Sequence, residues 1–159
     1  MDSQPQRIQR CFRIADSRFP LYDATGARLY GGRWNSPGRG VIYAAETFAG
    51  AVLEVLVHAN IGRIPRTHAV IEIEIPVEVG IERVGVSAVV GWDDPSQLAS
   101  RSFGDRWLEE ARSAVLMVPS LVTRGREANV LLNPAHGAFV KITHLAPEAV
   151  IWDERLFQG

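Results

Sequence analysis

The chain has 159 residues, 47% of them apolar, and a formal net charge of −1. This length is typical of a single domain, residues 1–159, which can bury roughly 70% of the surface of its unfolded chain. Its 17 cationic side chains are scattered and all but Lys141 are arginines. This argues against a nucleic-acid-binding protein, which usually concentrates its basic residues on one face.

The first half of the chain predicts two strands and one helix. Residues 11–15 form a short apolar run, and residues 41–45 form a second one. Between them, residues 16–40 are irregular and rich in Gly, Pro and Asp, and a loop of this length is usually functional or hides an element. Thr47 is a candidate N-cap for a helix that runs to about Asn60. The apolar residues at helical spacing in this helix are Ala49, Val52, Leu53, Leu56 and Val57.

The second half predicts mostly strands. In residues 70–79, isoleucines alternate with glutamates, so one face of this strand is expected to be buried and the other wet. A short helix is expected over residues 105–113, after Gly104. The remaining expected strands are 81–84, 114–118, 129–132, 138–143 and 150–153. This order lacks a regular βαβ alternation, so the predicted fold class is α+β, with a mixed, mainly antiparallel sheet and a few helices.

Several classes of protein are disfavoured. Cys11 is the only cysteine, which rules out an internal disulfide or a Cys-rich metal site and suits a reducing compartment. Residues 1–10 are polar and do not form a secretory signal, and the longest apolar runs are far shorter than the ~20 residues of a membrane span. The four histidines form no HExxH-like pair. We therefore expect a cytoplasmic protein with no membrane contact and no metal.

The segment 30–40 is a candidate ligand-binding loop. Its glycines let the backbone approach a ligand closely, while Arg33 offers an anion contact, Trp34 a stacking surface and Asn35 an amide. It matches neither the Walker A spacing nor the dinucleotide-binding GxGxxG spacing. The alternative is a glycine-rich loop whose tryptophan packs on the core.

Tyr43 and Glu54 follow this loop, in the expected strand and helix. Glu54 is the only acidic residue from Phe48 to Asn60, in a helix that is otherwise largely apolar. A carboxylate in such a helix is seldom buried unless it is paired, and an arginine is its natural partner. The alternative places Glu54 on a narrow wet face beside His58 and Gly50.

Ser120 follows an expected strand, a common position for a site residue. It lacks the Gly-x-Ser-x-Gly elbow of a hydrolase nucleophile. The alternative is a turn hydroxyl that bonds to nearby backbone. Asn133 and Pro134 indicate another turn.

Together these motifs resemble the RES domain, the toxin half of a bacterial toxin–antitoxin pair. The family is named for an Arg, a Glu and a Ser, which implies Arg33, Glu54 and Ser120 as catalytic residues, with Arg13 and Tyr43 binding substrate. Trp34, Trp107 and Asn133 are expected to be structural. The resemblance covers, in order, residues 12–14, 31–35, 41–44, 53–54, 104–108, 118–120 and 129–136.

The resemblance implies a fold similar to ADP-ribosylating toxins and an activity that depletes NAD. NAD would be the substrate, cleaved at the nicotinamide–ribose bond by phosphorolysis or hydrolysis, with no cofactor and with phosphate as a possible co-substrate. At least one branch of the family is similar to protein ADP-ribosyltransferases. The partner implied is an Xre-type antitoxin. Two other readings stay open: a serine hydrolase using Ser120 with His136 or His144, and a binding module without turnover.

The residues suit this chemistry. Nicotinamide leaves NAD as a neutral base, while positive charge develops on the ribose, as in glycoside hydrolysis. Arg33 and Arg13 can hold phosphate oxygens in a fork. Glu54 can stabilise the cation, bind a ribose hydroxyl or orient the acceptor. Tyr43 can stack on nicotinamide or bond to ribose, and Ser120 can donate to phosphate or to the nicotinamide amide.

Overall fold

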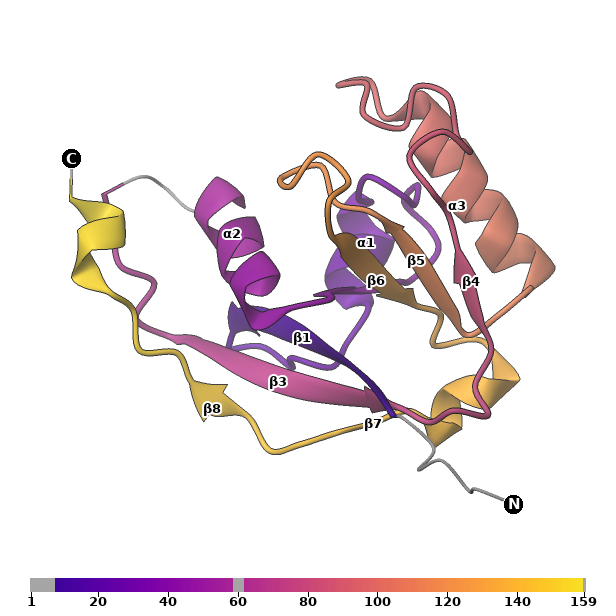
Figure 1. The fold of residues 1–159 in the computed structure, drawn as a ribbon. Coiled ribbons are helices and arrows are strands. Elements are labelled where there is room, and N and C mark those ends of the chain that lie inside the picture. Colours follow the sequence, from indigo (N-terminus) through magenta and orange to yellow (C-terminus); the bar gives the residue numbers. More distant parts are fainter. Residues whose placement is uncertain (1–7, 59–61, 159) are drawn as a thin grey trace, which may run out of the picture.

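An eight-stranded sheet organises the computed structural model, which describes residues 8–58 and 62–158 (Figure 1). The strands are β1 (Gln9–Asp16), β2 (Ile42–Ala45), β3 (His68–Ile75), β4 (Ile81–Arg83), β5 (Val115–Pro119), β6 (Ala128–Leu132), β7 (Thr143–His144) and β8 (Glu148–Ala149). Their order is β4-β5-β6-β2-β1-β3-β7, and β8 also pairs with β3. Of the strand pairs in the described residues, β4 and β5 run parallel and the others antiparallel. The predicted α+β class with a mixed, mainly antiparallel sheet is confirmed.

The helices differ more from the sequence-based expectations. They are α1 (Thr25–Tyr30), α2 (Phe48–His58), α3 (Leu98–Glu110) and the 3-10 helices η1 (Gly137–Lys141) and η2 (Glu154–Phe157). Helix α1 lies inside the segment 16–40 that was expected to be irregular, and none of its residues is buried. The strand expected over 138–143 was wrong, since η1 occupies most of it, and residues 150–153 form no strand. The predicted helix end at Asn60 lies outside the described residues.

Helix α3 begins seven residues before the expected start and runs through Gly104. A Cβ atom on Gly104 would overlap the carbonyl oxygen of Trp34 and lie 2.7 Å from its carbonyl carbon. The glycine therefore lets α3 touch the loop that contains Arg33. The predicted boundary was wrong because this glycine marks close packing rather than a helix end.

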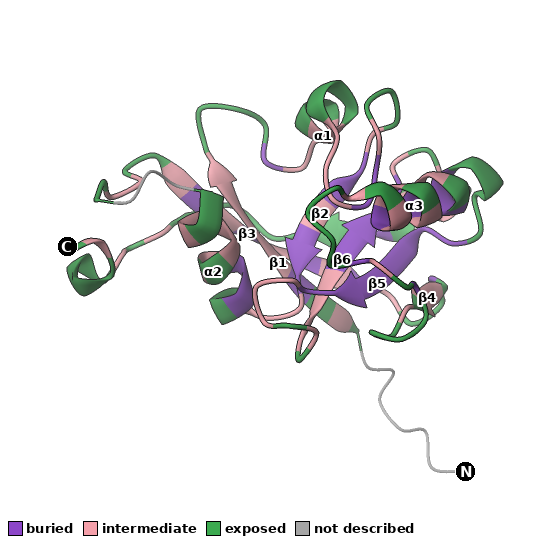
Figure 2. Ribbon diagram, turned by 90° about the horizontal axis from the view of Figure 1, so that it is seen from above, coloured by how far each residue is buried: buried purple, intermediate pink, exposed green. Residues whose placement is uncertain are grey.

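Two apolar clusters lie on the two sides of the sheet. One contains Cys11 and the alternating isoleucines of β3, which confirms the predicted one-sided burial of that strand. Burial raises the pKa of the Cys11 thiol to about 12. The other cluster packs α3 on β5 and β6 through Trp34 and Trp107, which are structural as expected. The buried residues are concentrated in the central strands β2, β5 and β6 (Figure 2).

Helix α2 packs on β1 and β2 with its small residues. Thr47 caps it as predicted, since its hydroxyl accepts the Gly50 N–H at 2.9 Å. Gly50 and Ala51 are buried, whereas Leu53 and Val57 are exposed. In the stripe of Gly50, Glu54 and His58 that the alternative interpretation placed in water, Gly50 is buried and Glu54 is half-buried, and only His58 is exposed. Among the described residues, no helix is long and apolar enough to cross a membrane.

Candidate functional site

A cleft of about 930 Å³ brings together most of the predicted site residues. Arg13, Arg33, Tyr43 and Glu54 all line it. Ser120 is not among its lining residues, although its two chain neighbours are. The titratable side chains along the cleft are Arg13, Asp23, Arg33, Tyr43, Glu54, His58, Arg63, His68 and Arg101. Arginines outnumber carboxylates, which favours an anionic ligand.

A tight turn presents Arg33 to the cleft. Helix α1 ends at Gly31, whose φ of 73° is the left-handed conformation that favours glycine. The Gly32 N–H then donates to the Asn35 carbonyl at 2.9 Å, which places Arg33 and Trp34 at the two corners. Trp34 turns into the core and is 2% exposed. The loop thus combines the two interpretations of its sequence, with a packed tryptophan beside an available arginine.

The Arg33 guanidinium is oriented by backbone. Its Nη1 donates to the carbonyls of Trp92 and Asp94, both at 3.1 Å. Within the part of the chain that the structure describes, its Nε and Nη2 have no hydrogen-bond partner. Arg101 lies beside this turn, since its Nε donates to the Gly32 carbonyl at 2.8 Å. Two arginines therefore share one end of the cleft, and such a pair of guanidinium groups suits a phosphate.

Tyr43 has a structural role that its sequence position did not suggest. Its hydroxyl donates to Asn35 Oδ1 at 2.6 Å and accepts the Trp34 N–H at 3.1 Å. Burial raises the pKa of this hydroxyl, which keeps it protonated. Asn35 is fully buried, and its Nδ2 donates to the carbonyl of Ala27 in α1 and to those of Ser36 and Arg39 in the loop. The hydroxyl is thus engaged inside the protein, and the ring face is what Tyr43 offers to a ligand.

Arg13 lies where β1 and β2 diverge. The two strands pair through Phe12 and Ala45, and the next side chain, Arg13, donates to the Leu21 and Tyr43 carbonyls, both at 2.8 Å. Desolvation lowers the pKa of Arg13, and Asp23 partly opposes this. The group remains charged at physiological pH. A half-buried cation bonded to carbonyls retains its charge for a ligand.

Glu54 is paired, but the expected arginine partner was wrong. Its Oε1 accepts a hydrogen bond from Asn129 Nδ2 at 3.0 Å, and His58 Nε2 lies 3.8 Å from its Oε2. The side chain is 31% exposed. No arginine forms an ion pair with it in residues 8–58 and 62–158. The carboxylate is therefore half-desolvated and held by a neutral amide, because β6 places Asn129 beneath α2.

Ser120 lies at the base of the loop that joins β5 to β6. The residue is 4% exposed, and its hydroxyl accepts the Thr123 N–H at 3.4 Å. Its own N–H donates to the Glu127 carbonyl at 3.0 Å. These bonds fit the alternative of a turn hydroxyl. The loop it supports adds Leu121 and Val122 to the cleft wall.

Comparison with known proteins shows the family. The model described as the RES domain matches residues 6–153. The chain belongs to the RES domain family. A protein named Prs ADP-ribosylating toxin, from Sphingobium sp. (strain YBL2), is 43% identical over 116 residues, covering 70% of this chain and 71% of that protein. A protein named Toxin Res, from Yersinia enterocolitica serotype O:8 / biotype 1B, is 33% identical over 154 residues. The match covers 91% of this chain and 97% of that protein.

A solved structure shows the same fold as this RES domain. It is the M. tuberculosis MbcT–MbcA toxin–antitoxin complex, with a TM-score of 0.71, 13% identity and coverage of 91% of this chain and 85% of that chain. Of the three residues predicted to be catalytic from the resemblance, Arg33 and Glu54 line the cleft, and Ser120 supports one wall.

Sequence reasoning missed several cleft residues of this RES domain. Arg101 was overlooked because the helix that carries it was expected to start later. Asn129 was assigned only to a strand, although its place two residues before the inward-facing Leu131 puts both side chains on the same face of β6. Gln97 and Arg63 come from loops and had no distinguishing pattern.

Proposed function

We propose that this RES domain breaks NAD at the bond between nicotinamide and ribose. The observation that carries the proposal is one cleft lined by four arginines, Arg13, Arg33, Arg63 and Arg101, together with the half-buried carboxylate of Glu54, which no arginine neutralises in the described residues. The arginines suit the pyrophosphate of a dinucleotide, and the carboxylate suits a cationic ribose. The cleft volume of about 930 Å³ lies at the upper end of the range of small-molecule sites, as a dinucleotide requires.

The chemistry asks little of the protein beyond positioning and charge. The bond between ribose C1 and the nicotinamide nitrogen breaks, and its electron pair leaves with nicotinamide, which becomes neutral. Because the leaving group needs no proton, one carboxylate is enough. Glu54 stabilises the cationic ribose until an oxygen of water or phosphate bonds to C1 and releases its proton.

The direct test is to incubate the purified protein with NAD, with and without inorganic phosphate, and to identify the products by mass. We expect nicotinamide together with ADP-ribose, or with its phosphorylated form when phosphate is the acceptor. NAD that stays intact under both conditions would overturn the proposal.

A second candidate is transfer of ADP-ribose to a protein. It is favoured by the relative named Prs ADP-ribosylating toxin, which is 43% identical to this chain. The same cleft serves both reactions, because they differ only in the acceptor at ribose C1. Labelled NAD added to a cell extract with the protein separates them, since transfer leaves label on protein bands and degradation leaves it on small products.

The serine hydrolase alternative gains no support. The Ser120 hydroxyl accepts a backbone N–H, His136 Nδ1 accepts the Ala138 N–H, and His144 Nδ1 lies 2.9 Å from the Leu145 carbonyl oxygen. Within the described residues, neither histidine bonds to Ser120.

We also propose an antitoxin partner of the Xre type that covers the cleft. A toxin that drains NAD needs an inhibitor, and the solved structure with the same fold is a toxin–antitoxin complex. Arg13 and Arg33 attract an acidic side chain or a chain-terminal carboxylate. NAD affinity of an inactive Glu54→Gln protein, measured with and without antitoxin, tests this. Equal affinity would favour inhibition at a distant surface.

A further inference from the structure

We propose that Asn129 is a positioning residue that holds one oxygen of the Glu54 carboxylate and thereby aims the other at the ribose. This inference rests on the proposed function and extends it to a residue that does not itself perform the chemistry. It begins from the hydrogen bond of 3.0 Å between Asn129 Nδ2 and Glu54 Oε1, which joins β6 to α2 across 75 positions of the chain.

Asn129 is fixed by the sheet. Its backbone is in register with Ala45 of β2 on one side and with Val118 of β5 on the other. It therefore lies on a central strand, where the backbone has little freedom to move. A side chain projecting from such a strand is a firmer support than one on a loop.

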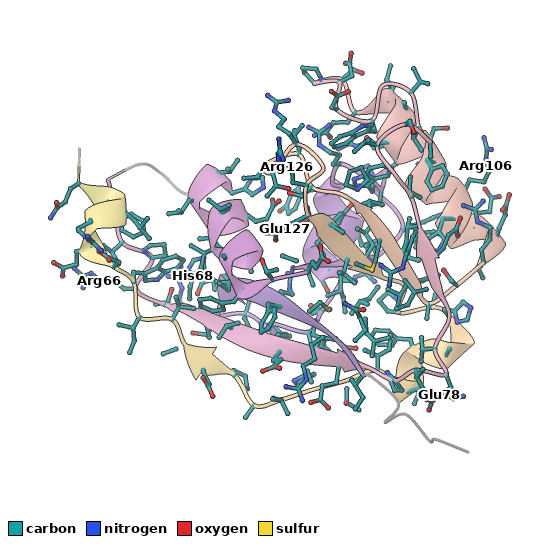
Figure 3. All side chains as sticks on the ribbon, in the orientation of Figure 1. Arg66, His68, Glu78, Arg106, Arg126 and Glu127 are labelled. Carbon is teal, nitrogen blue, oxygen red and sulfur yellow. The ribbon has the colours of Figure 1, made fainter. Side chains whose placement is uncertain are left out.

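The two residues just before Asn129 also hold the start of α2 in place through hydrogen bonds. Glu127 accepts a hydrogen bond from the Thr47 hydroxyl at 2.7 Å, and the Ala128 N–H donates to Glu46 at 2.8 Å. Glu127 lies between α2 and the start of β6 (Figure 3). The helix and its carboxylate are thus both placed against one short segment of chain.

His58, the other side chain near the Glu54 carboxylate, does not hold it rigidly. His58 Nε2 is 3.8 Å from Oε2, and the His58 side chain is 79% exposed. Exposed ion pairs of this kind hold side chains weakly. Asn129 is therefore the rigid contact, and Oε2 is the oxygen left to the cleft.

The neutrality of Asn129 matters for the reaction. An arginine in its place would hold Glu54 equally well but would cancel much of the negative charge that a cationic ribose needs. A neutral amide orients the carboxylate and leaves its charge available. This explains why the expected arginine is absent from this contact.

The test compares Asn129→Leu, which removes the donor at similar volume, with Asn129→His, which keeps an N–H donor at a similar position. We expect Asn129→Leu to lower kcat for NAD cleavage about 10- to 100-fold while KM stays within about twofold, because misplacing a catalytic group by about 1 Å has effects of this size. Asn129→His should recover part of the loss. Thermal melting of each variant identifies general loss of fold.

The outcomes separate this inference from the proposed function. If the wild-type protein leaves NAD intact, the proposed function fails. Suppose instead that the wild type consumes NAD and that a folded Asn129→Leu protein keeps its kcat, with or without a change in KM. The positioning role is then overturned and the proposed function stands. Equal losses in the Leu and His variants would show that the donor is not what matters, which also overturns it.

The contact has a readout that needs no substrate. In 1H–15N spectra, the side-chain amide signal of Asn129 should shift strongly on Glu54→Ala. It should stay in place on Glu109→Ala, a matched change at an exposed position of α3. If the Asn129 side-chain amide signal does not shift on Glu54→Ala, the inference is overturned, independently of the kinetic results.

Discussion

Replacing Gly104 by alanine should displace the turn that carries Arg33 and lower both stability and turnover. The added Cβ would overlap the Trp34 carbonyl oxygen and lie 2.7 Å from its carbonyl carbon. Carbon atoms in contact are about 3.5 Å apart, so the turn must retreat by about 1 Å or α3 must move outward. Gly104 and Trp34 are both buried, which leaves no free space for either movement.

The size of the effect follows from this geometry. Overpacking of a buried contact costs about 1–3 kcal/mol, which corresponds to about 2–12 °C in Tm for a domain of this size. A shift of Arg33 by about 1 Å is expected to lower kcat/KM for NAD by up to about 100-fold. Differential scanning calorimetry and a nicotinamide-release assay measure the two effects separately.

Gly26→Ala is the matched control. Gly26 lies in α1, and nothing lies within 4 Å of the Cβ it would gain. An alanine there should leave turnover unchanged and raise stability by about 0.5–1 kcal/mol, because glycine disfavours the helix. A Gly104→Ala protein with wild-type Tm and turnover would refute the close-packing argument.

Three further predictions follow from individual side chains. Arg33→Lys should raise KM for NAD or lower kcat, because lysine lacks the guanidinium fork. The control Arg106→Lys, on the outer side of α3, should match the wild type (Figure 3). Equal kinetics for the two variants would contradict the phosphate role of Arg33. Tyr43→Phe should lower the free energy of unfolding in urea by about 1–3 kcal/mol, because it leaves the buried Asn35 carboxamide without its donor; unchanged stability would argue against this role. Cys11 is buried and has a pKa of about 12, so its thiolate fraction at pH 8 should be about 10⁻⁴. It should therefore react with a thiol reagent only after the protein unfolds. Rapid labelling of the native protein would speak against its burial.

Local patterns were enough to predict the strands with clear alternation. The period of two in β3 identified its buried isoleucines, and Thr47 identified the start of α2. Residues 138–143 were misassigned because an apolar run of that length does not distinguish a strand from a turn of helix. The structure explains the outcome, since the His136 side chain accepts the Ala138 N–H and starts η1, while Val140 stays 82% exposed.

The orientation of α2 depends on tertiary packing. Hydrophobic periodicity alone favours burial of its large apolar residues. The helix instead approaches the sheet through Gly50 and Ala51, which leaves Leu53 and Val57 at the surface and brings Glu54 to the cleft. Close approach of a helix through small residues cannot be distinguished in sequence from an ordinary solvent-facing stripe.

The candidate site was predictable only in part for a similar reason. The motif around Arg33 and the lone carboxylate of Glu54 carry local signals. The contact between Glu54 and Asn129 joins residues far apart in the chain, and it exists because β6 pairs with β2 beside α2. Arg101 likewise reaches the cleft only because α3 packs on the Arg33 turn.

Under the proposed function, the Glu54 carboxylate drives the loss of nicotinamide from NAD. The most direct measurement compares nicotinamide release by the wild-type protein, Glu54→Gln and Glu109→Gln. Glu54→Gln keeps the size of the side chain but removes its charge, so it should fold normally and release no measurable nicotinamide, while Glu109→Gln, on the exposed side of α3, should match the wild type. A folded Glu54→Gln protein that releases nicotinamide at the wild-type rate would contradict the account.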